Sequence, residues 1–406
     1  MTAATLPPAG NQDVETISLI GFAHGVSHFF HLLLPPLFPW LMPEFGLSFT
    51  GIGATMTVFF VISACGQALA GFLVDRFGAA RVLAGGIGCF LVASLLLAVA
   101  DGYGTLMVVA AFAGLGNSVF HPADFTVLNR HVSQPRLGHA FSMHGLSGNI
   151  GWALAPLFLT GLASTAGWRW AALGAAAVAF LSLSLLVWRR HALTDPPDFH
   201  AAARATAAVS PFAFLRSSAV WMCFAFFFFI TAAFGAIQNF APPILQALYG
   251  LSLATAVTSL SAYLFGSAAG ILTGGFLAQK GEHDRLIAAA LGAAALLALL
   301  LAVGVVPGWS AMPLMAVIGF CTGIAGPSRD LLVRRAATSR FGQAAYGRVY
   351  GFVYSGLDAG LALAPLAFGS LMDGRRFGEV LVGIALLQGL AIFTALRVGT
   401  NVRAPA

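Results

Sequence analysis

The sequence predicts an all-α membrane protein with twelve transmembrane helices arranged in two six-helix pseudo-symmetric halves. The first observation behind this prediction is composition. Charged residues make up 8% of the 406 residues, hydrophobic residues make up 59%, and the mean hydropathy is +0.88. An ordinary soluble domain contains about 25% charged residues and needs a polar exterior. This composition therefore excludes a water-soluble fold.

The second observation is the length and spacing of the apolar runs. A transmembrane helix needs about 20 predominantly apolar residues. The runs are continuously apolar rather than alternating, which argues against a β-barrel. The twelve expected spans lie near residues 17–43, 50–74, 82–100, 104–129, 138–164, 167–188, 217–247, 254–278, 286–305, 309–333, 343–371 and 377–397.

The third observation is an internal repeat. Residues 151–162 read GWALAPLFLTGL and residues 360–371 read GLALAPLAFGSL, so seven of twelve positions match at an offset of 209. The proline pair at 35–36 recurs at 242–243, an offset of 207. Parallel repeats of this kind are found in secondary transporters, which place the substrate site between the two halves.

The repeat also predicts the domain organisation. We expect an N-terminal six-helix half at 1–190, a cytoplasmic linker at 191–216 and a C-terminal six-helix half at 217–406. The linker falls in the longest polar segment, which holds a proline pair and several arginines. The sequence contains no GxxxxGK[ST] phosphate loop and no HExxH or GxSxG motif. ATP hydrolysis and an intramembrane enzyme are therefore not expected.

Basic residues are distributed unevenly between the two sides of the expected bundle. Of the 20 lysines and arginines, 16 fall on the side that holds both termini. Arg169, Arg375 and Arg376 fall on the other side, and Arg329 lies within a span. The positive-inside rule then places both termini in the cytoplasm. Because topology explains the net charge of +6, no nucleic-acid partner is expected.

The loop after the second expected span carries a family signature. GFLVDRFGAAR at 71–81 resembles the cytoplasmic loop between the second and third helices of the major facilitator superfamily. The resemblance assigns this gating loop to Gly71, Asp75, Arg76, Gly78 and Arg81. The counterpart at 275–285, GFLAQKGEHDR, has Gln279 where the acid would be and is a degenerate copy.

Two further stretches resemble the fosmidomycin-resistance-like branch of that superfamily. VFHPADFTVL at 119–128 and HGLSGNIGWALAPL at 144–157 resemble its fourth and fifth helices. Asp124 stands one position later than the family acid, and residues 147–149 replace a double glycine. The resemblance implies a bacterial-type inner (plasma) membrane transporter that works by alternating access.

Ionisable side chains inside the expected spans are the candidates for transport chemistry. Charge in a bilayer costs about 2.5–3.5 kcal/mol on insertion scales. His24, His28 and His31 share one face of the first helix. For His24 and His28, proton relay or anion contact is as plausible as polar packing, whereas packing is favoured for His31. His121 and Asp124 stand at i, i+3, where they could share a proton. That role is favoured over an ion pair with a neighbouring helix.

The second half offers its own candidates. Arg329 could hold an anionic substrate by a forked hydrogen bond, or could neutralise Asp124 or Asp358. When the repeats are aligned on Pro122 and Pro327, Asp124 and Arg329 occupy matched positions. These two residues could then face each other across a central cavity.

Further polar residues complete the expected cavity. Tyr350, Tyr354 and Asp358 recur every four residues on the eleventh span, where the tyrosines could equally be aromatic packing. A possible polar lining adds His144, Asn149, Gln238 and Asn239. The predicted substrate-binding or proton-coupling set is Asp124, Arg329, Asp358, His24, His28, His121, His144, Asn149, Tyr350 and Tyr354.

The favoured function is proton-coupled efflux of a drug-like or metabolite substrate, with the proton on Asp124 or Asp358 and histidine assistance. The alternative is a proton-coupled importer of a small organic anion. Metal-ion transport is a minor hypothesis, because imidazoles with carboxylates suit divalent metals but here lie on three helices. No metal site or cofactor is predicted. The expected partners are a small-molecule substrate, protons and the lipid bilayer, and the expected state is a monomer.

Overall fold

Apolar helices make up most of the part of the molecule that the structure describes. A computed structural model describes residues 11–133, 136–193, 213–278, 283–341 and 346–403. These ranges are helical almost throughout and contain no strand. Twelve segments within them are long and apolar enough to cross a membrane. The predicted fold class is therefore confirmed.

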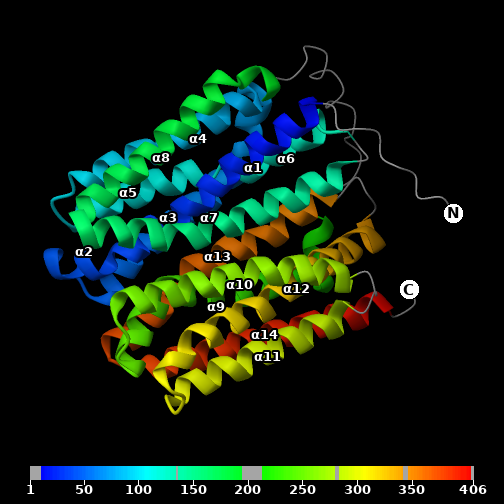
Figure 1. The fold of residues 1–406 in the computed structure, drawn as a ribbon. Helices are drawn as coiled ribbons and strands as arrows, with labels where there is room; N and C mark the ends of the chain where they lie inside the picture. Colours follow the sequence, from blue (N-terminus) through cyan, green and yellow to red (C-terminus); the bar gives the residue numbers. More distant parts are fainter. Residues whose placement is uncertain (1–10, 134–135, 194–212, 279–282, 342–345, 404–406) are drawn as a thin grey trace.

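The helices of the first half lie together on one side of the molecule, and those of the second half on the other (Figure 1). The first group is α1 (Asn11–His31), α2 (Phe38–Phe45), α3 (Phe49–Phe77), α4 (Ala79–Ala98), α5 (Tyr103–Asn117), α6 (Phe120–His131), α7 (Leu137–Ala166) and α8 (Trp168–Trp188). The second group is α9 (Ser218–Tyr249), α10 (Leu253–Ala278), α11 (His283–Val303), α12 (Ala311–Phe341), α13 (Tyr346–Asp373) and α14 (Phe377–Arg403).

Two spans of the first half are broken. Between α1 and α2 the chain leaves the α-helix and passes through a short 3-10 turn, η1 (Pro35–Leu37), whose two prolines cannot donate backbone hydrogen bonds. The fourth span breaks between α5 and α6. The matched helices α9 and α12 run without a break through their own prolines. Irregular backbone inside a membrane is tolerated only where protein buries it, and residues 32–37 are buried.

The two halves meet along two helix pairs that the repeat relates to each other. Helix α3 packs against α13, and α7 packs against α10. The repeated stretches at 151–162 and 360–371 lie in α7 and α13. The repeated loop signatures begin at the C-terminal ends of α3 and α10. Pseudo-two-fold symmetry therefore exchanges one contact for the other, as expected for parallel repeats.

The contact between α3 and α13 includes hydrogen bonds across the halves. The Thr57 hydroxyl donates to the Ala362 carbonyl at 2.6 Å. At the last residue of α13, the Asp373 carboxylate accepts from the backbone N–H of Phe49 at 2.6 Å and of Thr50 at 3.1 Å. A carboxylate of the second half thus caps the first turn of a helix in the first half.

Glycines bring α10 and α12 into close contact. The backbone oxygens of Ala316 and Phe320 stand where a Cβ on Gly266 or Gly270 would lie. Helices in lipid associate through van der Waals packing, so small residues at the contact let the backbones approach. For this pair, the four-residue spacing of the two glycines serves helix packing.

Candidate functional site

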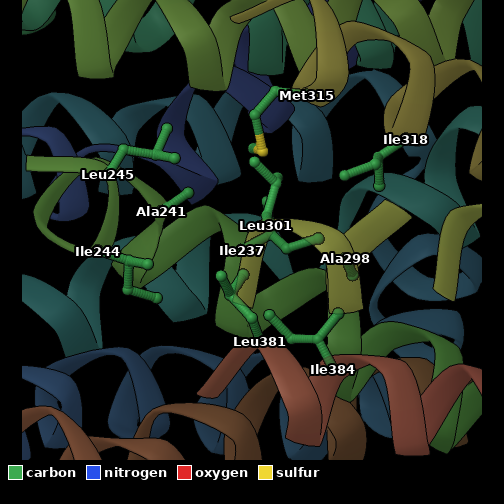
Figure 2. A pocket seen from close by; sticks show the side chains of 10 residues that line it. All are labelled: Ile237, Ala241, Ile244, Leu245, Ala298, Leu301, Met315, Ile318, Leu381 and Ile384. Carbon is green, nitrogen blue, oxygen red and sulfur yellow. The ribbon is translucent and has the colours of Figure 1, made fainter. Parts of the chain in front are cut away.

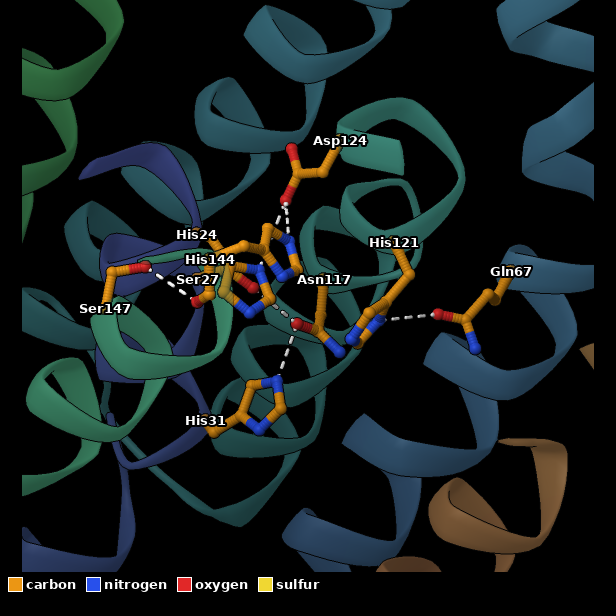
Figure 3. Close-up of polar contacts among 9 residues, drawn as sticks. All are labelled: His24, Ser27, His31, Gln67, Asn117, His121, Asp124, His144 and Ser147. Atoms are coloured by element: carbon orange, nitrogen blue, oxygen red, sulfur yellow. Dashed lines mark hydrogen bonds and ion pairs between the residues drawn. The ribbon is translucent and has the colours of Figure 1, made fainter. Parts of the chain in front are cut away.

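A group of buried imidazoles surrounds one carboxylate in the first half. We define the histidine–aspartate cluster as His24, His28, His121, Asp124 and His144. Asp124 is 0% exposed. Its Oδ2 accepts from His24 Nδ1 at 3.2 Å and from His144 Nε2 at 3.0 Å (Figure 3). The rings of His24 and His144 stack at a centroid distance of 3.5 Å. Helices α1, α6 and α7 therefore converge on a single carboxylate oxygen.

His28 completes the cluster by packing rather than by hydrogen bonding. Its ring lies 4.3 Å from that of His24 and 4.1 Å from that of Trp152, between centroids. His28 is 8% exposed, and neither ring nitrogen has a hydrogen-bond partner among the described residues. The same holds for Oδ1 of Asp124. Buried polar atoms without partners are uncommon and call for a physical explanation.

Gly148 makes room for the His28 ring. A Cβ at this position would lie 2.6 Å from His28 Nδ1 and 3.0 Å from His24 Nε2. Gly145, one turn earlier on α7, has open space at the equivalent point. The sequence segment that replaces the family's double glycine thus keeps the one glycine that the ring needs.

Replacing Gly148 with alanine is expected to lower the stability of the protein by about 1–3 kcal/mol, because the new methyl group forces the imidazole out of place. The thermal unfolding midpoint of the purified protein would fall. Gly145→Ala is the matched control and should leave the midpoint unchanged or slightly higher. Equal midpoints for the two variants would contradict the proposed close contact.

An amide network holds the neighbouring end of α1. Asn117 Oδ1 accepts from Ser27 Oγ at 2.8 Å and from His31 Nε2 at 2.7 Å (Figure 3). Asn117 Nδ2 also donates to Ser63 Oγ at 2.9 Å. These bonds join α1, α3 and α5 beside the break in the fourth span. The arrangement supports the favoured interpretation of His31 as polar packing.

Gln67 links the cluster to the second half. His121 Nδ1 donates to Gln67 Oε1 at 3.1 Å, and Gln67 Nε2 donates to Asp358 Oδ2 at 3.2 Å. Gln67 lies on α3 and Asp358 on α13, so one amide bridges a histidine and a carboxylate in different halves. Asp358 is 4% exposed, and Gln67 is its only hydrogen-bond partner in the described parts of the chain.

Sequence reasoning missed Gln67, Asn117 and Trp152. Each is a polar or amphipathic residue within an apolar run, and that was the signal available. An isolated amide or indole in a span is often no more than contact between helices. Only the packing of α3 against α13 shows that Gln67 touches ionisable groups on both sides.

Arg329 lies in the second half against an aromatic ring. Its guanidinium carbon is 4.8 Å from the centroid of Phe227, a cation–π distance. The ring of Tyr354 is 4.8 Å from Phe227 and 6.4 Å from His121. Where the structure describes the chain, Asp124 bonds to histidines of its own half and not to Arg329. The carboxylate is already enclosed by α1, α6 and α7, so the matched repeat positions do not form an ion pair.

The remaining predicted residues fall into three groups. Asn149 and Asn239 donate to carbonyls of their own helices, at 3.0 Å and 2.7 Å. In the loop predicted to act in gating, Gly78 adopts a φ of 83° between α3 and α4, and Arg76 and Arg81 are exposed. The side chains or surroundings of three predicted residues lie outside what the structure describes: Gly71, Asp75 and Tyr350.

A separate apolar pocket lies inside the second half (Figure 2). It is lined by Ile237, Ala241, Ile244, Leu245, Ala298, Leu301, Met315, Ile318, Leu381 and Ile384. None of these side chains can donate a hydrogen bond or carry charge. Ligand sites usually need a few placed polar groups to orient the ligand. The polar cluster and the cross-half link are therefore better candidates for the functional site.

The chain matches a family model over most of its length. Residues 20–365 match the model described as Major Facilitator Superfamily. The chain belongs to the major facilitator superfamily. Members of this superfamily are membrane transporters, which confirms that this chain is a transporter of a small substrate and not an enzyme.

Two individual relatives of this chain agree with its assignment to the superfamily. The chain is 28% identical over 275 residues to a fosmidomycin resistance protein of Escherichia coli, covering 65% of each chain and thus just under two thirds of that relative. This similarity confirms the resemblance to the fosmidomycin-resistance-like branch. The chain is 24% identical over 387 residues to a probable nitrate/nitrite transporter of Mycobacterium tuberculosis, covering 92% of each.

A solved structure shows the same fold. A bacterial homolog of the human lysosomal transporter Spinster, in an inward-facing and occupied conformation, superimposes with a TM-score of 0.78. The two chains are 12% identical, and the match covers 98% of this chain and 100% of the other. At this identity the likeness concerns the fold alone.

Proposed function

We propose that this transporter couples proton movement to the efflux of a small drug-like or metabolite substrate by alternating access. It acts as a monomer in a bacterial inner membrane, with both termini cytoplasmic. The halves 1–190 and 217–406 move against each other, joined by the linker 191–216. The observation that supports the coupling best is the Gln67–Asp358 hydrogen bond, which places a buried carboxylate on the contact between the halves.

Asp358 is the group that we assign to the proton. A charged carboxylate in the bilayer interior is costly, and a neutral amide partner offsets only part of that cost. Protonation removes the charge. It also converts a hydrogen bond to a charged acceptor, worth about 1.5–3 kcal/mol, into a neutral one worth about 0.5–1.5 kcal/mol. The α3–α13 contact is thereby weakened, so proton binding favours separation of the halves.

Asp124 has a different environment. Both of its hydrogen-bond partners, His24 and His144, belong to the same half as Asp124 itself, so a change in these contacts does not act directly on the other half. We therefore assign the cluster to ligand binding, with His121 facing Tyr354 across the interface at 6.4 Å. Arg329 would supply a cationic contact from the opposite side.

Import of a small anion is a second candidate function. Two observations favour it, namely the guanidinium of Arg329 over Phe227 and the similarity to a probable nitrate/nitrite transporter. A guanidinium presents a rigid fork of donors that suits planar anions. Counterflow of labelled anions in proteoliposomes would distinguish import from drug efflux.

The test of proton-coupled efflux is transport by purified protein in proteoliposomes. Candidate substrates are first selected by ligand-induced thermal stabilisation. An imposed pH gradient is expected to drive uphill movement of a selected compound, and a protonophore should abolish it. If the flux only follows the substrate gradient and ignores pH, the transporter is not proton-coupled.

A further inference from the structure

The histidine–aspartate cluster has the donor atoms of a metal site. Within the described part of the chain, two overlapping groups bring three potential ligand atoms within 4.8 Å of one another. One group is His24, His28 and His121, and the other is His24, Asp124 and His144. His24 belongs to both. All but His121 are buried, and His121 is partly buried.

The distances in the second group suit tetrahedral coordination. Nitrogen and oxygen ligands about 2.0–2.1 Å from a zinc ion are separated from one another by about 3.3 Å. The two imidazole nitrogens lie 3.2 Å and 3.0 Å from Asp124 Oδ2. These separations are close to the distance between two ligands of one zinc ion, so a cation could take the place of the two hydrogen bonds.

Several donor atoms of the cluster have no other partner. Both ring nitrogens of His28 and Oδ1 of Asp124 are buried without a hydrogen-bond partner among the described residues. Leaving such a group unsatisfied costs about 1–3 kcal/mol. Unsatisfied buried atoms that converge in one place are explained by a bound ion or by water. The convergence of imidazoles and a carboxylate, with their ligand atoms within 4.8 Å of one another, favours the ion.

Neighbouring residues hold the potential ligands as metal sites usually require. His121 Nδ1 is fixed by Gln67 Oε1, which leaves Nε2 as its possible ligand atom. Metal-binding histidines commonly hydrogen-bond a second residue through the other ring nitrogen. Trp152 packs against His28 with the two rings tilted, and Gly148 provides the space for the His28 ring.

We propose that the cluster binds a borderline divalent transition-metal cation of the zinc, cobalt or nickel class. Imidazole with one carboxylate suits these ions, whereas calcium and magnesium require sets of oxygen ligands. This is the cluster to which we assign ligand binding, so the inference rests on that part of the proposed function. It does not depend on whether Asp358 carries a proton.

The test is binding of Co²⁺ to the full-length protein, purified in detergent without an affinity tag. We expect one Co²⁺ per chain, with the strong visible absorption of a four-coordinate site, displaced by Zn²⁺. His28→Gln and Asp124→Asn should each weaken binding at least about tenfold, in line with losses on altering metal sites. Thermal unfolding in metal-free buffer establishes that each variant is folded.

His139→Gln and His191→Gln are the matched controls, because both histidines are exposed and outside the cluster. These variants should bind Co²⁺ as the unaltered protein does. The proposal is overturned if no stoichiometric binding occurs below millimolar Co²⁺, which would leave water in the cluster. It is also overturned if only the exposed-histidine variants lose binding. Neither outcome affects proton coupling, which is measured separately through pH-driven flux.

Discussion

Asp358→Asn is expected to abolish pH-driven substrate flux while leaving the protein folded. Asparagine can still accept the hydrogen bond from Gln67 Nε2, but it cannot take up a proton. The cross-half contact then has a fixed strength throughout the cycle. We expect at least a tenfold loss of pH-driven flux in proteoliposomes, equivalent to about 1.4 kcal/mol or more in the driving step.

Two variants control this experiment. Asp101→Asn alters an exposed carboxylate that accepts from Thr105, and it should leave the flux unchanged. Asp358→Glu keeps a titratable group and should retain part of the coupling. Substrate-induced thermal stabilisation should survive in Asp358→Asn, since the binding groups assigned to the cluster are intact. Full pH-driven flux in Asp358→Asn would refute the assignment of the proton to this residue.

Asp124→Ala should have the largest effect on folding. The substitution leaves His24 Nδ1 and His144 Nε2 buried without their shared acceptor, and each unsatisfied group costs about 1–3 kcal/mol. A total loss of about 2–5 kcal/mol is expected, seen as a lower thermal unfolding midpoint in detergent.

Asp124→Asn offers a graded comparison, because its amide oxygen can still accept one of the two hydrogen bonds. Its midpoint should fall between those of the unaltered protein and Asp124→Ala. Asp101→Ala, on the surface at the start of α5, should change the midpoint little. If Asp124→Ala is no less stable than Asp101→Ala, the carboxylate does not hold the cluster together.

The fold was accessible from sequence because the bilayer imposes a simple rule on helix length and polarity. Each transmembrane span is recognisable in the sequence as a run of about 20 apolar residues, whichever helices it packs against. The helix breaks were not accessible in the same way. The proline pair at 35–36 lies in a broken span, whereas the pair at 242–243 lies within a continuous helix. The same proline pair lies in a 3-10 turn in one half and in an α-helix in the other. The packing around it therefore decides which backbone conformation forms.

The sequence predicted the ionisable residues of the candidate site but not the contacts between them. His24, His28 and His144 stood out because such residues are rare in apolar spans. Their convergence on Asp124 depends on how α1, α6 and α7 pack, which no spacing along the chain encodes. Matched repeat positions likewise give a symmetry relation rather than a distance. For this reason Asp124 and Arg329 occupy matched positions in the repeat but do not contact each other.

The cap that Asp373 forms on α3 joins the two halves at the end of the molecule away from the chain termini. Its two backbone hydrogen bonds are the kind of cap whose loss costs about 0.5–2 kcal/mol. An energy of that size biases a two-state equilibrium by roughly 2- to 30-fold. A contact of this size favours the association of the two halves at that end without adding a large barrier to their separation.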